Sequence, residues 1–191
     1  VQECGAGLLP LAIEGSGADR QIFVTAPDAR LVELEPERLD ALRDALGAAP
    51  IGGSVPLSIS LGPIWLVVQL DDARAVTRLA PDMTRLGAFT RSIGVTGVTV
   101  FGRFAEGADA INVRSFAPAE GVPEDPVCGS GNAAVGHYVA RAPHLAGLLP
   151  GYTASQGREI GRDGRVRVRL NAGRVEIGGQ AITCVDGSLL A

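Results

Sequence analysis

The chain has few of the residues that build metal sites or disulfide frameworks. Among 191 residues there are 3 cysteines and 2 histidines. The cysteines lie far apart and form no Cys-x-x-Cys pair, so neither a zinc site nor a disulfide-rich module is expected. An odd number of cysteines, with no signal-like segment at the printed start, favours a reducing, cytoplasmic location.

Long apolar runs and blocks of basic residues are also absent. No apolar stretch reaches the roughly 18–20 residues that span a bilayer, so no contact with a membrane is expected. The net charge is −4, with no cluster of Lys or Arg, so nucleic acid is not an expected partner. A hydrophobic content of 46% against 20% charged residues provides enough material for a sizeable core.

Short strands dominate the pattern that remains, because 26 glycines and 12 prolines predict many turns. The predicted strands are 8–13, 21–25, 31–34, 56–61, 65–70, 95–104, 109–116, 152–156, 165–170, 174–177 and 181–185. The predicted helices are 36–46, 74–80, 81–92 and 131–141. The expected fold class is α+β, a curved, mostly antiparallel sheet wrapped round one central helix. The helix over 131–141 fits that place, because its small residues let a sheet close round it.

The stretch PEDPVCGSGNAAVGHYVA, at positions 123–140, is the main candidate for a functional site. Ser130 is predicted to be the N-cap of a helix that begins at Gly131. The first amides of a helix have no internal acceptor and attract anions. Gly129 and Gly131 let a ligand approach the backbone, and Asn132 is a further predicted substrate-binding residue. Since no Lys or Arg lies in the loop, a small carboxylate fits better than a diphosphate. The alternative is an ordinary capped helix after a tight turn.

Two side chains beside this helix start are candidates for proton transfer. Asp125 precedes Pro126, which favours an extended backbone there, and nearby donors would keep its carboxylate charged. Alternatively, Asp125 only complements the helix dipole. The thiol of Cys128 is expected to have a lowered pKa at a helix N-terminus and to act as a base or nucleophile. The alternative for Cys128 is a small buried hydrophobe.

Four separated segments resemble the phenazine-biosynthesis PhzF-like family, within the diaminopimelate epimerase-like fold. They are VQECGAGL at 1–8, GPIWLVVQL at 62–70, VRSFAPAEGVPEDPVCGSGNAAVG at 113–136 and QGREIGR at 156–162. The resemblance implies two pseudo-symmetric halves, each a sheet round a helix, with the active site in the cleft between them. It also implies a homodimeric isomerase that moves a proton on a small carboxylate-bearing substrate in a biosynthetic process. Neither a metal nor an organic cofactor is implied.

Residue by residue, the resemblance assigns catalytic roles to Asp125 and Ser130. The family's acid–base glutamate and its Gly-His-Pro stretch belong to the first half, and no position here matches them. We therefore expect an incomplete first half and a chain that holds half of an active site. The expected division is a remnant of the first domain at 1–30, a second domain at 31–180, and a return strand toward the first domain at 181–191.

Cys128 departs from the family, in which threonine is common at this position. The sequence Cys-Gly-Ser-Gly is closer to the two-thiol diaminopimelate epimerases and proline racemases of the same fold. In those enzymes one cysteine takes the α-proton and another returns a proton to the opposite face. A cysteine-based amino-acid epimerase or racemase that uses Cys128 therefore remains an alternative. So do a non-catalytic carboxylate-binding protein and a purely structural capped helix.

Overall fold

The computed structural model describes residues 1–5, 7–171, 173–185 and 187–188. The strands are β1 (Gln2–Cys4), β2 (Gly7–Leu9), β3 (Leu11–Glu14), β4 (Gln21–Thr25), β5 (Arg30–Glu33), β6 (Leu57–Ser60), β7 (Ile64–Gln69), β8 (Gly97–Arg103), β9 (Ile111–Ala117), β10 (Val122–Asp125), β11 (Gly151–Gln156), β12 (Gly164–Asn171) and β13 (Arg174–Gln180). The α-helices are α1 (Leu39–Leu46), α2 (Ala73–Thr77), α3 (Met83–Ser92) and α4 (Gly129–Arg141). Short 3-10 turns cover Gly17–Asp19, Pro36–Arg38, Pro118–Glu120, Pro143–Leu148 and Arg158–Ile160.

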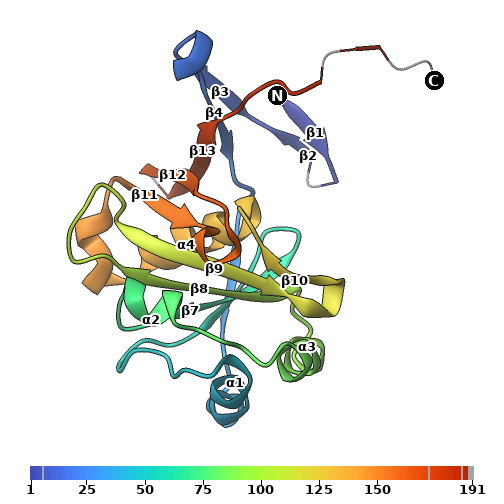
Figure 1. Cartoon of the computed structure of the whole chain (residues 1–191), viewed down its shortest axis with the longest axis vertical. Coiled ribbons are helices and arrows are strands. Elements are labelled where there is room, and N and C mark those ends of the chain that lie inside the picture. Colours follow the sequence, from blue (N-terminus) through green and yellow to red (C-terminus); the bar gives the residue numbers. More distant parts are fainter. Residues whose placement is uncertain (6, 172, 186, 189–191) are drawn as a thin grey trace.

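One large curved sheet organises the molecule (Figure 1). Within the described residues its strand order is β3-β4-β13-β12-β11-β9-β8-β7-β6-β5, with β10 paired to β9 beside this path. The strands β1 and β2 form a separate hairpin. Only the β7–β8 and β11–β9 pairs of the described sheet are parallel. The predicted α+β class and the mostly antiparallel sheet are confirmed.

The central helix is α4, which packs against β12, β13 and β7 on the inner side of the sheet. Ala134 and Val135 are fully buried there, in one core cluster with side chains from seven strands. Close approach requires Gly136, because a Cβ at that position would lie 2.7 Å from the side chain of Val175. The predicted small-residue helix inside a sheet is confirmed.

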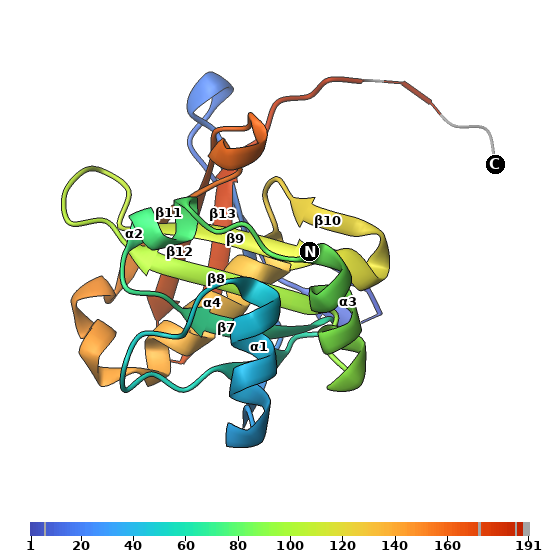
Figure 2. The same ribbon diagram turned by 60° about the horizontal axis from the view of Figure 1, so that its bottom comes forward.

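The other face of the sheet is covered by α1 and α3 (Figure 2). Strand β7 contributes side chains to the cores on both faces of the sheet, because successive side chains of a strand point to opposite faces. Trp65 and Val67 join the core around α4, whereas Leu66 and Val68 join the core under α1 and α3. A strand buried on both faces reads as a continuous apolar run, which is the pattern of this segment.

Local patterns predicted several elements closely. The helix expected over 36–46 is a 3-10 turn followed by α1, and it ends at Gly47, which has a φ of 77°. This left-handed conformation suits glycine and is a common helix stop. On β12 the arginines and aliphatic residues alternate as predicted. Arg167 is exposed, whereas Val168 is buried against the core.

The strand predicted at 181–185 is absent from these described residues. Residues 181–185 and 187–188 have no regular secondary structure, and 186 and 189–191 lie outside the described residues. Ile182 and Val185 are 87% and 88% exposed. Their β-propensity is not enough, because a strand forms only where a neighbouring strand offers backbone partners.

The predicted domain division at residue 30 stays a prediction. The segment before it is continuous with the main sheet, because β4 pairs with β13. No helix in the described part of the chain is both long and apolar enough to cross a membrane.

Candidate active site

The helix α4 begins two residues earlier than the sequence predicted, and its N-cap is earlier by the same two residues. Cys128, with extended dihedral angles (φ −84°, ψ 107°), is the N-cap. Its Sγ accepts a hydrogen bond from the N–H of Gly131 at 3.2 Å. The prediction that Ser130 caps a helix starting at Gly131 is therefore wrong. The thiol takes the place that a hydroxyl usually fills.

Two N–H groups at this helix start have no partner in the described part of the chain. Of the first four amides, that of Gly131 donates to Cys128 Sγ and that of Asn132 to Cys128 O, at 3.0 Å. The N–H groups of Gly129 and Ser130 donate to no acceptor among the described residues. Gly129 is exposed and Ser130 is half-buried. Amides of this kind, at the positive end of a helix of 13 residues, attract anions.

Asp125 lies at the end of β10, three residues before the N-cap, in the extended backbone that the sequence predicted. Its Oδ1 accepts the N–H of Val127 at 2.9 Å, and its side chain is half-buried. Its Oδ2 makes no hydrogen bond with the described residues. One carboxylate oxygen therefore orients the side chain, while the other is available to a ligand.

A buried amide side chain, Gln156, holds both ends of the loop that carries these groups. Its Oε1 accepts the N–H of Cys128 at 3.1 Å, and its Nε2 donates to the carbonyl oxygen of Asp125 at 3.0 Å. The same Oε1 accepts Nδ2 of Asn132 at 2.7 Å. Gln156 and Asn132 are both fully buried. The sequence signal for Gln156 was present, since it opens the QGREIGR segment, but its role at the site was missed.

Two of the predicted substrate-binding residues are used within the protein. The Nδ2 of Asn132 donates to Gln156 and to the carbonyl oxygen of Cys128, so a ligand contact by Asn132 is not supported. A Cβ at Gly131 would lie 2.7 Å from Ser115 Oγ and 2.9 Å from Thr99 Oγ1. Gly131 is therefore needed for packing against buried hydroxyls, and its N–H is already occupied.

Cys128 is buried, with 4% of its surface exposed. Burial raises the pKa of its thiol, and this desolvation outweighs the hydrogen bond from the Gly131 N–H, which acts in the opposite direction. The expectation of a lowered pKa is therefore wrong. The helix start lowers a thiol pKa only where the thiolate stays solvated or paired. In this position the neutral thiol is favoured.

An ion pair anchors the strand that ends in Asp125. Nη2 and Nε of Arg114 on β9 donate to the two carboxylate oxygens of Glu124 at 2.7 and 2.8 Å. Their side chains are only 7% and 8% exposed. Nη1 of Arg114 also donates to the carbonyl oxygens of Val76 and Leu79. The pair therefore fixes β10 to β9 and to the turn that follows α2.

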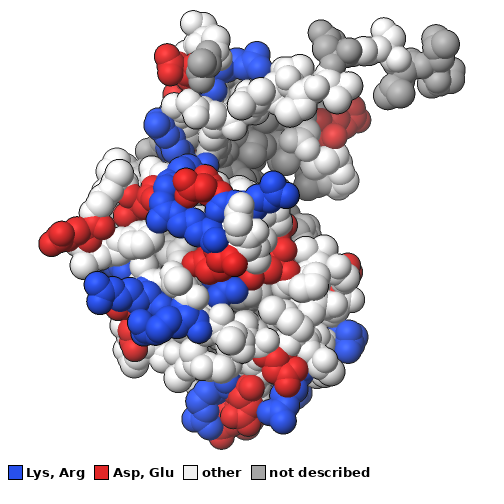
Figure 3. Space-filling view, in the orientation of Figure 1, with Lys and Arg blue, Asp and Glu red and all other residues white. Residues whose placement is uncertain are grey.

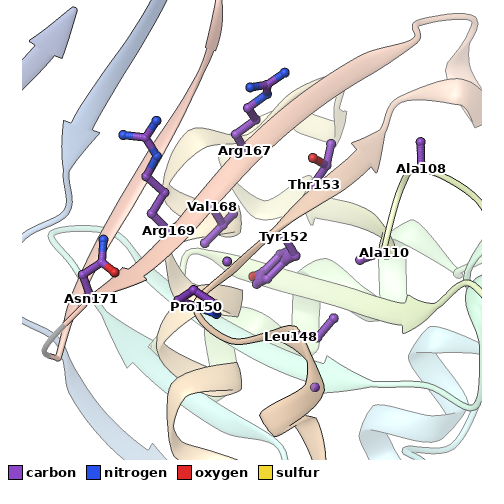
Figure 4. A pocket seen from close by; sticks show the side chains of 12 residues that line it. Ala108, Ala110, Leu148, Pro150, Tyr152, Thr153, Arg167, Val168, Arg169 and Asn171 are labelled. Atoms are coloured by element: carbon purple, nitrogen blue, oxygen red, sulfur yellow. The ribbon is translucent and has the colours of Figure 1, made fainter. Parts of the chain in front are cut away.

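A hollow of about 670 Å³ lies over β11 and β12, with Thr153, Arg167 and Arg169 on its wall (Figure 4). None of the six predicted site residues is among the described residues that line it. Arg169, on the wall of the hollow, forms an ion pair with Glu14. Acidic and basic side chains are intermingled on the face that Figure 3 shows. Charge of one sign does not accumulate there. In the described parts of the chain, no three His, Cys, Asp or Glu side chains are grouped to hold a metal ion.

Comparison with known proteins identifies relatives along the whole chain. A family model described as phenazine biosynthesis-like protein, PhzC-PhzF, matches residues 1–187. Antisense-enhancing sequence 1 of Schizosaccharomyces pombe is 36% identical over 98% of this chain and 65% of its own length. An uncharacterized isomerase of Deinococcus radiodurans is 30% identical over 95% of this chain and 59% of its own length. The chain thus spans less than two thirds of these relatives.

Solved structures share the fold at lower identity. A PhzF-family protein of Bacillus anthracis superimposes with a TM-score of 0.76 at 20% identity, covering 92% of this chain and 63% of that one. A predicted epimerase of Pseudomonas aeruginosa gives 0.70 at 20% identity, covering 90% and 59%. A probable proline racemase of Agrobacterium radiobacter gives 0.59 at 16% identity, covering 96% and 59%. At these identities the likeness shows the fold, which is the diaminopimelate epimerase-like fold expected from the sequence.

Proposed function

Because the chain belongs to the phenazine biosynthesis-like PhzC-PhzF family, we propose that it forms part of an isomerase. Its reaction would move a proton on a small carboxylate-bearing substrate. Several relatives are named isomerases. The observation that carries the proposal is the pair of N–H groups at Gly129 and Ser130, which have no acceptor among the described residues, beside the half-buried carboxylate of Asp125.

Each group has a defined task in this proposal. The two N–H groups and the positive end of α4 bind the substrate carboxylate. Asp125 accepts a proton from a substrate carbon, so that the C–H bond breaks. The electron pair of that bond delocalises into the π system of the substrate. Return of the proton to another position or face completes the isomerisation with no net change in atoms. The Ser130 hydroxyl donates a hydrogen bond to the negative charge that develops meanwhile.

We further propose that these 191 residues provide one side of the site, and that an acid–base group from elsewhere in the protein completes it. The family resemblance supports this, as does the share of the relatives that the chain covers. The chemistry requires side chains only, so neither a metal nor an organic cofactor is part of the proposal. The chain alone, without the completing segment, is expected to bind small carboxylates but to turn them over poorly.

Solvent deuterium exchange tests the proposed reaction. The complete protein would be incubated in D₂O with a panel of dihydrobenzoates, amino acids and α-hydroxy acids. We expect deuterium to enter a carbon-bound position of at least one acid, detected by mass spectrometry and proton NMR. The Asp125→Asn protein serves as the background reaction. If the folded complete protein bound these acids but exchanged no carbon-bound proton in any of them, a carboxylate-binding protein without catalysis would be the better account.

The thiol-based route is the second candidate, and Cys128→Ser separates the two. Because Cys128 is buried, caps α4 and has a raised pKa, its role is proposed to be structural. Serine is a good N-cap, so we expect the exchange rate of Cys128→Ser to stay within about threefold of the unaltered protein. Complete loss of exchange in a stably folded Cys128→Ser protein would instead favour the epimerase-like thiol mechanism.

A further inference from the structure

The single tryptophan of the chain, Trp65, contacts the proposed site through Ser130. It lies on β7, and only 4% of its surface is exposed. Its Nε1–H donates to Ser130 Oγ at 2.9 Å. The ring is held tightly in place, because even a Cβ at Gly97 would lie 2.6 Å from its Cζ3. The indole N–H is thus presented to Ser130 in one fixed orientation.

The direction of this hydrogen bond is set by chemistry. An indole N–H can only donate, so Ser130 Oγ is the acceptor and uses one lone pair. The neighbouring Cys128 Sγ lies 3.7 Å from Ser130 Oγ, a hydrogen bond in which either atom could be the donor. With the thiol neutral, its S–H can donate to the second lone pair of Ser130 Oγ. In that arrangement the single hydroxyl hydrogen of Ser130 points away from both the indole and the thiol. Donation to the oxygen also polarises the O–H bond, which makes that hydrogen a better donor.

Resting on the proposed function, we infer that Trp65 is a positioning residue for the reaction. It fixes the Ser130 hydroxyl as a hydrogen-bond donor toward the negative charge that the substrate develops. Three donors then converge on one ligand: the N–H groups of Gly129 and Ser130 and the hydroxyl of Ser130. Without the indole N–H, the hydroxyl would be free to rotate and to donate elsewhere. The loss would then raise the activation free energy of proton transfer by more than it weakens the binding free energy of the substrate.

An isosteric replacement tests this role without emptying the core. Benzothienylalanine at position 65 has sulfur where the indole has N–H, and it keeps the two-ring shape. We expect kcat for deuterium exchange to fall roughly tenfold, as for loss of one hydrogen bond, with KM changed less than about twofold. Ser130→Ala is expected to lower kcat by about 10²-fold. In the Ser130→Ala background the replacement at position 65 should have no further effect, because the two groups act as one unit.

A matched control is Tyr138→Phe, which removes a different aromatic donor from the same core cluster. Its kcat should be unchanged. The inference is overturned if the benzothienylalanine protein keeps full kcat, or if its effect and that of Ser130→Ala are independent. Either result would leave the proposed function standing, because the unaltered protein would still exchange deuterium.

A second measurement does not depend on catalysis. It therefore distinguishes failure of this inference from failure of the proposed function. The indole ¹H–¹⁵N resonance of Trp65 reports on its acceptor directly. We expect Ser130→Ala to shift this resonance and to speed its hydrogen exchange, and saturating benzoate to shift it in the unaltered protein only. If benzoate shifted the Gly129 amide but left the indole unmoved, the inference would fail while the anion site remained. If Ser130→Ala left the indole resonance unmoved, the hydrogen bond itself would be contradicted.

Discussion

Replacing Arg114 by methionine is expected to lower the free energy of unfolding by about 3–5 kcal/mol. The change leaves the carboxylate of Glu124 buried without its cation, since both side chains are less than a tenth exposed. It also removes the donors that Arg114 supplies to the carbonyl oxygens of Val76 and Leu79. Urea unfolding followed by circular dichroism measures the loss. Because β10 leads directly to Asp125, the same change should disturb the site even where the chain still folds.

The size of this effect follows from burial, and a surface pair provides the control. Arg85 and Asp82 form an ion pair at 3.4 Å, but their side chains are 68% and 49% exposed. Arg85→Met should therefore cost only about 0–1 kcal/mol. The double change of Arg114→Met with Glu124→Leu should cost less than Arg114→Met alone, since no buried charge then remains. Equal, small losses for the Arg114 and Arg85 variants would contradict the anchoring role of the buried pair.

Asp125→Asn is expected to reduce deuterium exchange by about 10²–10⁴-fold, the usual contribution of a positioned acid–base group. Asparagine keeps the oxygen that accepts the Val127 N–H, and it is equally suited to this short turn. The substitution therefore removes proton transfer while the loop geometry is retained. Exchange rates and thermal unfolding would be measured on the same preparation. Affinity for benzoate should change little or rise, because a negative charge beside the anion site is lost.

The control is Asp82→Asn, because Asp82 also accepts backbone N–H groups with Oδ1, at Thr84 and Arg85 on the start of α3. It is far along the chain from α4 and is expected to leave exchange unchanged. If Asp125→Asn kept the full rate, Asp125 would only complement the helix dipole and orient the loop. In that case the proton-transfer group would have to be sought elsewhere.

The parts of this structure that the sequence predicted well are those set by local patterns. The alternation on β12, the stop at Gly47 and the small residues of α4 each depend on a few neighbouring positions. Strand β10 was missed, because Val-Pro-Glu-Asp has no alternation of its own. It becomes a strand only because β9 lies beside it with free backbone groups. Pairing of that kind depends on the assembled sheet and cannot be read from four residues.

At the candidate site, too, features set by neighbouring residues were predicted, whereas contacts from distant strands were missed. A helix start within the Cys-Gly-Ser-Gly segment, with Asp125 shortly before it, follows from the sequence to within two residues. The contributions of Trp65 and Gln156 do not, because they come from β7 and β11 and meet the loop only in the folded sheet. Propensity favoured Ser130 over Cys128 as the cap. The fold reversed this, because Cys128 points into the core while Ser130 faces the indole.

The central claim is that the unpartnered N–H groups at the start of α4 bind a carboxylate, and Gly129 allows a direct test. Gly129 is the first residue of the helix, where proline is well tolerated, and Cys128 before it is already extended. Gly129→Ala adds a Cβ in ordinary contact with Ile177 and keeps the N–H, whereas Gly129→Pro removes the N–H.

The measurement is the dissociation constant for benzoate in these two variants by calorimetry. We predict that the proline variant binds about tenfold more weakly than the alanine variant, at equal thermal stability. Equal affinities in two equally stable proteins would show that the carboxylate is held elsewhere and would contradict the account.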